Sequence, residues 1–123
     1  GLLIHWDGND WNSATLSISA DIINLWASGS KNVWAVTASG FLHWDGQVWE
    51  PVEIGAGGLS SLWGSSDRDL WAAGPAGRLL HFDGESWLRS DPGTRSDILS
   101  VGGSSDGDVW ILTSFGGILR KHR

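Results

Sequence analysis

The chain has 123 residues, which is enough for one domain with its own hydrophobic core. It carries 14 acidic and 8 basic side chains for a formal net charge of −6, and basic residues cluster only in the last four positions, so we expect no nucleic-acid partner and no binding to an anionic membrane. The chain contains 10 Trp and no Cys, which excludes disulfides and thiol chemistry, and no apolar run approaches the length that spans a bilayer.

The first predicted element is a β-hairpin that occurs three times along the chain. Its copies read L-I-H-W-D-G-N-D-W at Leu3–Trp11, G-F-L-H-W-D-G-Q-V-W at Gly40–Trp49 and L-L-H-F-D-G-E-S-W at Leu79–Trp87. Apolar and polar residues alternate on either side of an Asp-Gly pair, which is the strongest short-range signal for a tight hairpin turn. Each copy therefore predicts two antiparallel strands.

The pairing within the second copy follows if Asp45 and Gly46 are the two loop residues. Trp44 is then expected to pair with Gln47, and the indoles of Trp44 and Trp49 become diagonal neighbours on one face. Both faces of such a hairpin are largely apolar. We therefore expect other elements of the structure to cover each side.

Two further short strands are predicted ahead of the later hairpin copies. They are Ile22–Ser28 with Val33–Thr37, Leu59–Ser65 with Leu70–Ala73, and Ile98–Gly103 with Val109–Thr113. Asn32, Asp69 and Asp108 precede the second strand of each pair, where a short acceptor side chain is expected to bond backbone N–H groups of the turn. Matching glycines at 40, 77 and 116 are expected to have positive φ. Gly102 stands where the other pairs have Trp26 and Trp63.

Four short antiparallel strands in a repeat of about 38 residues are the outline of a β-propeller blade. We predict an all-β fold in which 1–123 form a single propeller module. Its parts are the outer strands of an interrupted blade (1–21), two blades (22–58 and 59–97) and the inner strands of an interrupted blade (98–123). Because propellers typically have at least about four blades, we expect the ring to be completed by self-association, with a dimer of six blades favoured. Residues 1–6 and 117–121 are both third strands, and the pattern leaves open which of them is used in closure.

These repeats resemble a known family in two features, the Asp-x-Trp at 69–71 and 108–110 and the G-F-L-H-W-D-G-Q-V-W at 40–49. They are similar to the tryptophan-rich propeller repeats of many secreted bacterial proteins, and the resemblance covers the whole chain and implies an extracellular location. Residues 104–110 also resemble the Asp-box turn of sialidase-type propellers, although an Asp stands where that motif has Gly. Propellers with short, near-identical blades include lectins assembled from identical subunits, so the resemblance implies glycan binding.

Eight of the ten tryptophans fall into two groups by their place in the repeat. Those on the inner strands are interpreted as packing residues: Trp26, Trp34, Trp63, Trp71 and Trp110. Those on the outermost strand are the candidate sugar-stacking residues, each with the nearby turn carboxylate: Trp11, Trp49 and Trp87 with Asp7, Asp45 and Asp83. The leading hypothesis is multivalent carbohydrate binding with one weak site in each blade. The alternative is a protein-interaction or purely structural propeller with no small-molecule ligand.

Metal and catalytic sites are expected to be absent. One His and one turn Asp in each repeat (His5, His43 and His81 with the carboxylates above) cannot complete a zinc shell, so a structural role is favoured. The acidic turns at 67–69 and 106–108 lack the spaced ligand series of a calcium site. Polar residues repeat between copies instead of differing, which suits several equivalent binding sites more than one active centre. We therefore predict no cofactor and no enzymatic activity.

Overall fold

The structure is a computed structural model that describes residues 2–15, 21–52 and 58–122. Gly1, 16–20, 53–57 and Arg123 lie outside the described residues, and with them parts of the predicted segments 1–21, 22–58 and 98–123. The elements are β1 (Leu2–Trp6), β2 (Trp11–Thr15), β3 (Ile22–Gly29), β4 (Asn32–Thr37), β5 (Gly40–Trp44), β6 (Trp49–Val52), β7 (Ser61–Ser66), β8 (Asp69–Ala73), the 3-10 turn η1 (Pro75–Gly77), β9 (Leu79–Phe82), β10 (Trp87–Ser90), β11 (Ile98–Gly103), β12 (Asp108–Thr113), the 3-10 turn η2 (Ser114–Gly116) and β13 (Ile118–His122). No helix in the described ranges is long and apolar enough to cross a membrane.

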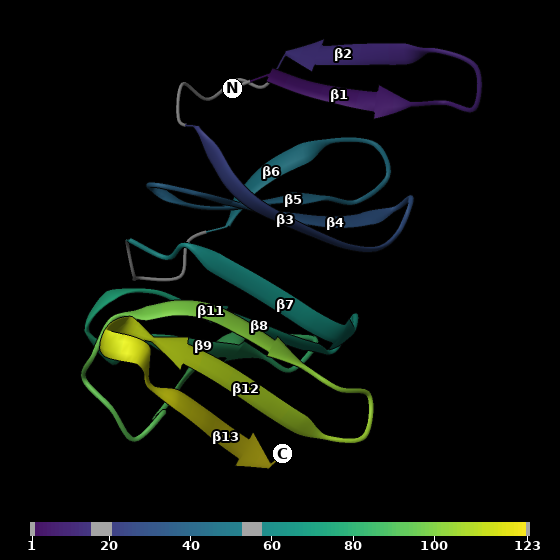
Figure 1. Cartoon of the computed structure of the whole chain (residues 1–123). Helices are drawn as coiled ribbons and strands as arrows, with labels where there is room; N and C mark the ends of the chain where they lie inside the picture. Colours follow the sequence, from purple (N-terminus) through teal and green to yellow (C-terminus); the bar gives the residue numbers. More distant parts are fainter. Residues whose placement is uncertain (1, 16–20, 53–57, 123) are drawn as a thin grey trace.

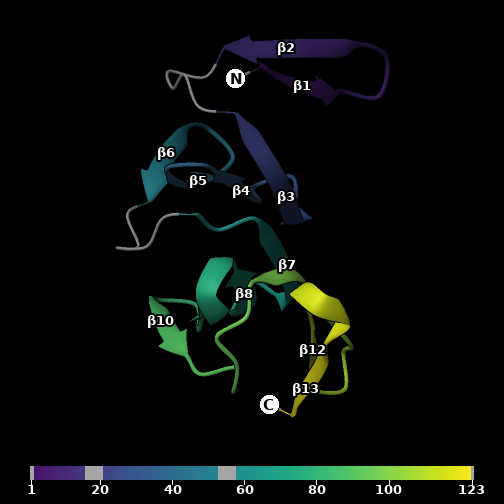
Figure 2. The same cartoon turned by 60° about the vertical axis from the view of Figure 1, so that its left-hand side comes forward.

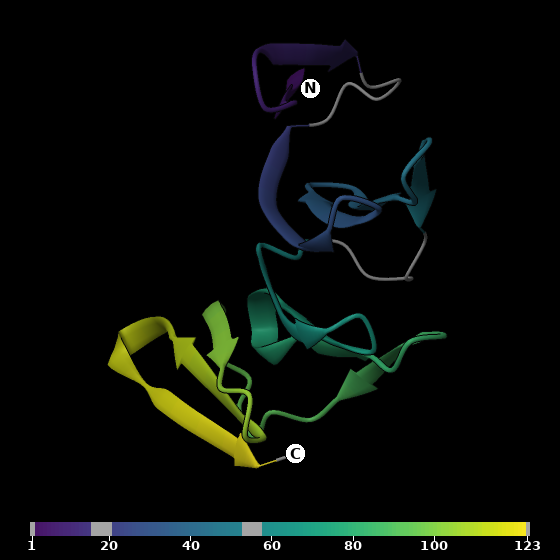
Figure 3. The same ribbon diagram turned by 90° about the vertical axis from the view of Figure 1, so that its right-hand side faces the viewer.

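The strands form four antiparallel sheets that follow one another along the chain (Figure 1). They are the hairpin β1–β2, the four-stranded sheets β3–β4–β5–β6 and β7–β8–β9–β10, and the three-stranded sheet β11–β12–β13. The all-β class and the four strands of the repeat are therefore confirmed. The hairpin lies at one end of the row and the β11–β13 sheet at the other (Figure 3). β3 and β7 lie along one side of the row, and β6 and β10 along the opposite side (Figure 2).

The hydrophobic core lies between successive sheets. Strand alternation places Trp34, Val36 and Phe41 on one face of the β3–β6 sheet, where they form a core cluster with Leu62 and Leu80 of the next sheet. We call this the forward face, because it points toward the next sheet along the chain. The equivalent forward face of the β7–β10 sheet, which carries Trp71, Ala73 and Leu79, packs against Val101, Val109 and Ile111. Each sheet thus covers a face that its neighbour leaves bare.

Tryptophans of the inner strands cross from one sheet to the next. The indole Nε1–H of Trp26 donates to the carbonyl oxygen of Gly64 over 3.1 Å. The ring lies so close that a Cβ at Gly64 would be 2.9 Å from two of its carbon atoms. In the same way, a Cβ at Gly103 would lie 2.5 Å from Cη2 of Trp63. The glycine after the inner-strand tryptophan position therefore gives room for the indole of the preceding sheet.

The predicted hairpin register is wrong by two residues. Trp44 pairs with Trp49, not with Gln47, so the two indoles lie directly opposite each other, with ring centroids 5.7 Å apart. The physical reason is the side chain of Asp45, whose Oδ1 accepts hydrogen bonds from the backbone N–H groups of Gln47 and Val48 at 2.8 and 3.0 Å. These bonds favour a four-residue turn, in which Gly46 alone has positive φ.

Candidate functional site

A polar and aromatic cluster recurs on the second and third strands of three sheets. In the β3–β6 sheet, Nε2–H of His43 donates to Oδ1 of Asn32 over 2.6 Å, and its ring stacks on Trp34 with centroids 4.3 Å apart. Burial lowers the pKa of His43 below its ordinary value of 6.5. The imidazole of His43 thus joins β4 to β5.

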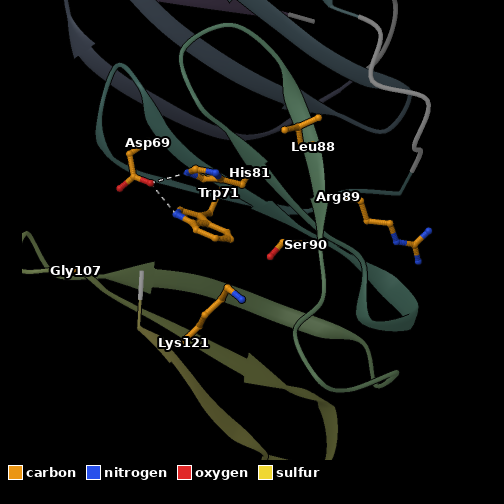
Figure 4. Close-up of a pocket in the computed structure, with 8 residues that line it drawn as sticks. All are labelled: Asp69, Trp71, His81, Leu88, Arg89, Ser90, Gly107 and Lys121. Atoms are coloured by element: carbon orange, nitrogen blue, oxygen red, sulfur yellow. Dashed lines mark hydrogen bonds and ion pairs between the residues drawn. The ribbon is translucent and has the colours of Figure 1, made fainter.

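The β7–β10 sheet builds the same cluster with a carboxylate (Figure 4). Oδ1 of Asp69 accepts hydrogen bonds from Nε1–H of Trp71 at 3.0 Å and from Nε2 of His81 at 2.8 Å. The Ser65 hydroxyl donates to the other carboxylate oxygen. The rings of Trp71 and His81 are 4.2 Å apart, and burial lowers the pKa of His81. All these groups are used in holding adjacent strands together.

In the β11–β13 sheet an arginine stands in the histidine position. Nε of Arg120 donates to Asp108 at 2.8 Å, and Nδ1 of His122 lies 2.7 Å from the other carboxylate oxygen. These two bonds lower the pKa of Asp108. The Arg120 guanidinium lies over the Trp110 ring, 5.7 Å from its centroid. The bonds of Asn32, Asp69 and Asp108 thus link strands through side chains, where the sequence predicted bonds to the backbone of the turn.

The candidate carboxylates at 7, 45 and 83 lie in the hairpin turns. Oδ1 of Asp7 accepts from the backbone N–H groups of Asn9 and Asp10, each at 2.8 Å, and Nδ2 of Asn12 donates to Oδ2 at 2.8 Å. These bonds lower the pKa of Asp7 to about 2. Asp45 and Asp83 bond two turn N–H groups in the same way, and their pKa values are lowered for the same reason.

The candidate tryptophans at 11, 49 and 87 differ in exposure. Trp87 packs against the preceding sheet, with ring centroids 4.6 Å from Phe41 and 5.7 Å from Trp34. Trp49 is half-buried and packs against the cluster of Ala35 and Leu42, as Leu3 of the hairpin sheet also does. Trp11 is 64 % exposed. The structure therefore offers one open indole face among the three candidates, and their role as ligand-binding residues stays a prediction.

Two grooves open between the outer parts of successive sheets. One, of about 500 Å³, is lined by Trp34, His43, Val52, Phe82, Ser86 and Trp87. The other, of about 650 Å³, lies between the β7–β10 and β11–β13 sheets, and we call it the C-terminal groove. Its lining includes Asp69, Trp71, His81, Ser90, Gly107 and Lys121 (Figure 4). Sequence reasoning missed this groove, because no local pattern of residues marks it.

The acidic and histidine side chains do not gather into a metal-binding group within the ranges that the structure describes. The two acidic turns that the sequence singled out form internal hydrogen bonds. Asp69 bonds Trp71 and His81, and the Ser104 hydroxyl donates to Asp106. These arrangements explain the turn carboxylates through hydrogen bonding within the chain.

Comparison with solved structures gives the fold. The chain is similar to YCF48 from Cyanidioschyzon merolae, with a TM-score of 0.76 and 18 % sequence identity over 98 % of this chain. It is also similar to a structure described as YCF48 bound to D1 peptide, with a TM-score of 0.71 and 23 % identity over 94 % of this chain. These neighbours are β-propellers, and the chain spans 44 % and 42 % of their lengths. No family model and no curated protein matches the chain.

Proposed function

We propose that this chain is a protein-interaction module of the β-propeller type. We propose further that one polypeptide it binds is a second copy of itself. The propeller fold supports the class, and one of the similar structures holds a D1 peptide. In that protein the same architecture binds a polypeptide. No family model links the chain to the lectins.

The observation that carries the proposal is the exposure of one face of the last sheet. Phe41 and Leu79 occupy equivalent positions on the forward faces of the two four-stranded sheets and are 2 % and 0 % exposed, whereas the equivalent Ile118 is 67 % exposed. On β12, Trp110 is 46 % exposed, although Trp71 at the equivalent place is 3 % exposed. A face built to be covered is therefore bare, which marks an interaction surface.

The opposite end of the row is also bare. Ile4 of β1 is 54 % exposed, whereas Leu42, its equivalent in the next sheet, is 4 % exposed. Ile4 therefore lies on the side of the hairpin that a preceding sheet would cover. A heterologous contact between such ends, repeated with a closing rotation, gives a ring.

Two departures from the repeat fit a junction between copies. Trp26 and Trp63 each pack on a glycine of the next sheet, but the last sheet has Gly102 in the tryptophan position. The first sheet with inner strands has Ala27 in the glycine position. If these two sheets meet in an assembly, the missing indole leaves the room that the extra Cβ of Ala27 needs. Self-association thus explains why both positions change.

Glycan binding, the leading hypothesis from the sequence, is less well supported than protein binding. One weak site in each blade requires an open indole on each outer strand. Trp87 is used in packing between sheets, and Trp49 packs against Ala35 and Leu42. An extracellular location and the lack of enzymatic activity stay predictions. A glycan array with the assembled protein tests the carbohydrate hypothesis directly.

The experiment for the proposed function is sedimentation velocity on Ile118→Asp. We expect the parent chain to associate, and Ile118→Asp to shift it toward the monomer because a charge is placed in an apolar contact. Val48→Asp is the matched control, since Val48 is 49 % exposed but lies in a hairpin turn away from both ends. A monomeric parent, or equal association of parent and Ile118→Asp, would contradict the proposal. Circular dichroism of each variant checks the fold.

A further inference from the structure

The C-terminal groove has an equivalent within the chain whose occupant is visible. Trp87, at the start of β10, reaches back over the forward face of the β3–β6 sheet and joins the core cluster that contains Trp34, Phe41 and Val52. Trp49, at the start of β6, packs against Ala35 and Leu42 of its own sheet, as Leu3 of the hairpin sheet also does. The outer strand β10 thus places a tryptophan on the preceding sheet.

The C-terminal groove offers the same seat without a tryptophan in it. Trp71 and Ser90, which line it, stand in the positions that Trp34 and Val52 have one sheet earlier. The sheet that follows ends at β13, and within the described residues no strand pairs with the outer edge of β13. The groove therefore lies where the next outer-strand tryptophan belongs.

The chain also has one outer-strand tryptophan with no preceding sheet to cover. Trp11 begins β2 and pairs with Trp6, as Trp87 pairs with Phe82. Its turn carries the same side-chain bonds to the backbone, here made by Asp7. The indole is 64 % exposed, against a half-buried Trp87. β2, which begins with Trp11, and β13, which carries Lys121 of the groove, lie at opposite ends of the row of sheets (Figure 1), so Trp11 cannot reach the groove of its own chain.

We propose that the C-terminal groove of one copy binds Trp11 of a second copy, with β2 of that copy beside the open edge of β13. The contact continues the sheet-to-sheet interface that the chain already repeats, and it rests on the self-association proposed above. The indole supplies the apolar anchor of this contact.

Charge at the two surfaces is complementary. β13 carries Arg120 and Lys121, and Lys121 lines the groove. The turn that precedes β2 carries Asp7 and Asp10. In the assembly the acidic turn of one copy lies near the basic strand of the other, and the ammonium of Lys121 is placed beside the indole of Trp11. The chain as a whole has a net charge of −6. A basic strand beside the groove therefore favours contact with an acidic turn of this kind.

The test uses two single variants and their mixture. Trp11→Ala removes the anchor, and Ser90→Arg fills the seat; each is expected to weaken association at least about tenfold, as the loss of a central tryptophan does at protein interfaces. Ser30→Arg adds the same side chain in the exposed turn between β3 and β4 and is expected to associate like the parent. Native mass spectrometry and sedimentation velocity measure the species.

Mixing distinguishes a docking defect from a folding defect. Trp11→Ala keeps an intact groove and Ser90→Arg keeps an intact Trp11, so an equimolar mixture forms one sound junction and we expect a 1:1 pair that neither variant forms alone. If both variants associate like the parent, or if the mixture yields no pair, the groove is not the seat of Trp11. A parent that is monomeric at all concentrations overturns the proposed self-association itself. If the parent associates and Trp11→Ala associates equally well, only the inference about the groove is overturned.

Discussion

Gly64→Ala tests the contact that joins two successive sheets through an indole. The added Cβ would lie 2.9 Å from Cε2 and Cζ2 of Trp26 and 3.0 Å from Cγ of Leu70, closer than side-chain carbons normally approach. Overpacking of this kind costs about 1–3 kcal/mol in unfolding free energy. The Trp26 indole cannot move away freely, because its Nε1–H bonds the carbonyl of the same glycine. We therefore expect a loss of stability within that range.

Urea denaturation followed by circular dichroism measures this loss. Gly102→Ala is the matched control, because it lies one position earlier in the repeat on β11 and has no atom within 4 Å of the added Cβ. An alanine at a compatible site stabilises by about 0.4–1 kcal/mol through the unfolded chain. In a double variant, Trp26→Ala should remove most of the penalty at residue 64. If Gly64→Ala is as stable as Gly102→Ala, the indole does not pack on this glycine and the account of the sheet contact is refuted.

Three further predictions concern the sheets and their faces. Ser61→Ala should cost about 1–3 kcal/mol in unfolding free energy, because the buried backbone N–H of Val101 donates to the Ser61 hydroxyl over 3.0 Å and would lose its acceptor; a cost near zero in urea denaturation would show that this bond between sheets is not needed. The pKa of His43 is lowered by burial, so the unfolded chain binds the proton more readily than the folded chain. Stability should therefore fall as the pH drops below 6.5. Thermal melts should show a smaller fall for His43→Gln. Phe41→Ala should cost about 3–5 kcal/mol in the isolated chain, whereas Ile118→Ala at the equivalent but exposed position should change monomer stability by less than about 0.5 kcal/mol; equal costs would mean that the last sheet is covered as the others are.

The repeat was readable because its signals are local. The spacing of the histidines at 5, 43 and 81 sets the period, and the alternation around each Asp-Gly pair gives strands regardless of what covers them. The positive φ expected at Gly40 and its two equivalents is found, at 153°, 70° and 78°. These features depend on backbone sterics and on neighbours within one hairpin, which the sequence contains in full.

What the sequence did not predict depends on distant contacts and on side chains that replace backbone bonds. The predicted pairing of Trp44 with Gln47 is wrong because the Asp45 carboxylate closes a four-residue turn, where the Asp-Gly pair suggested a two-residue turn. The role of Gly64 was missed, although the order Trp-Gly at 63–64, Gly-Gly at 102–103 and Trp-Ala at 26–27 contained the signal. The C-terminal groove lies between two sheets whose facing residues are far apart in the sequence, and local patterns do not show which surface such a pair leaves open.

The central claim is that the bare sheet faces at the two ends of the row are completed by further copies of the chain. Native mass spectrometry of the 123-residue chain tests it most directly. The account predicts assemblies with more than one chain, with two chains favoured. A chain that stays monomeric and folded at every concentration measured, with Ile118 and Trp110 still open to solvent, would contradict it.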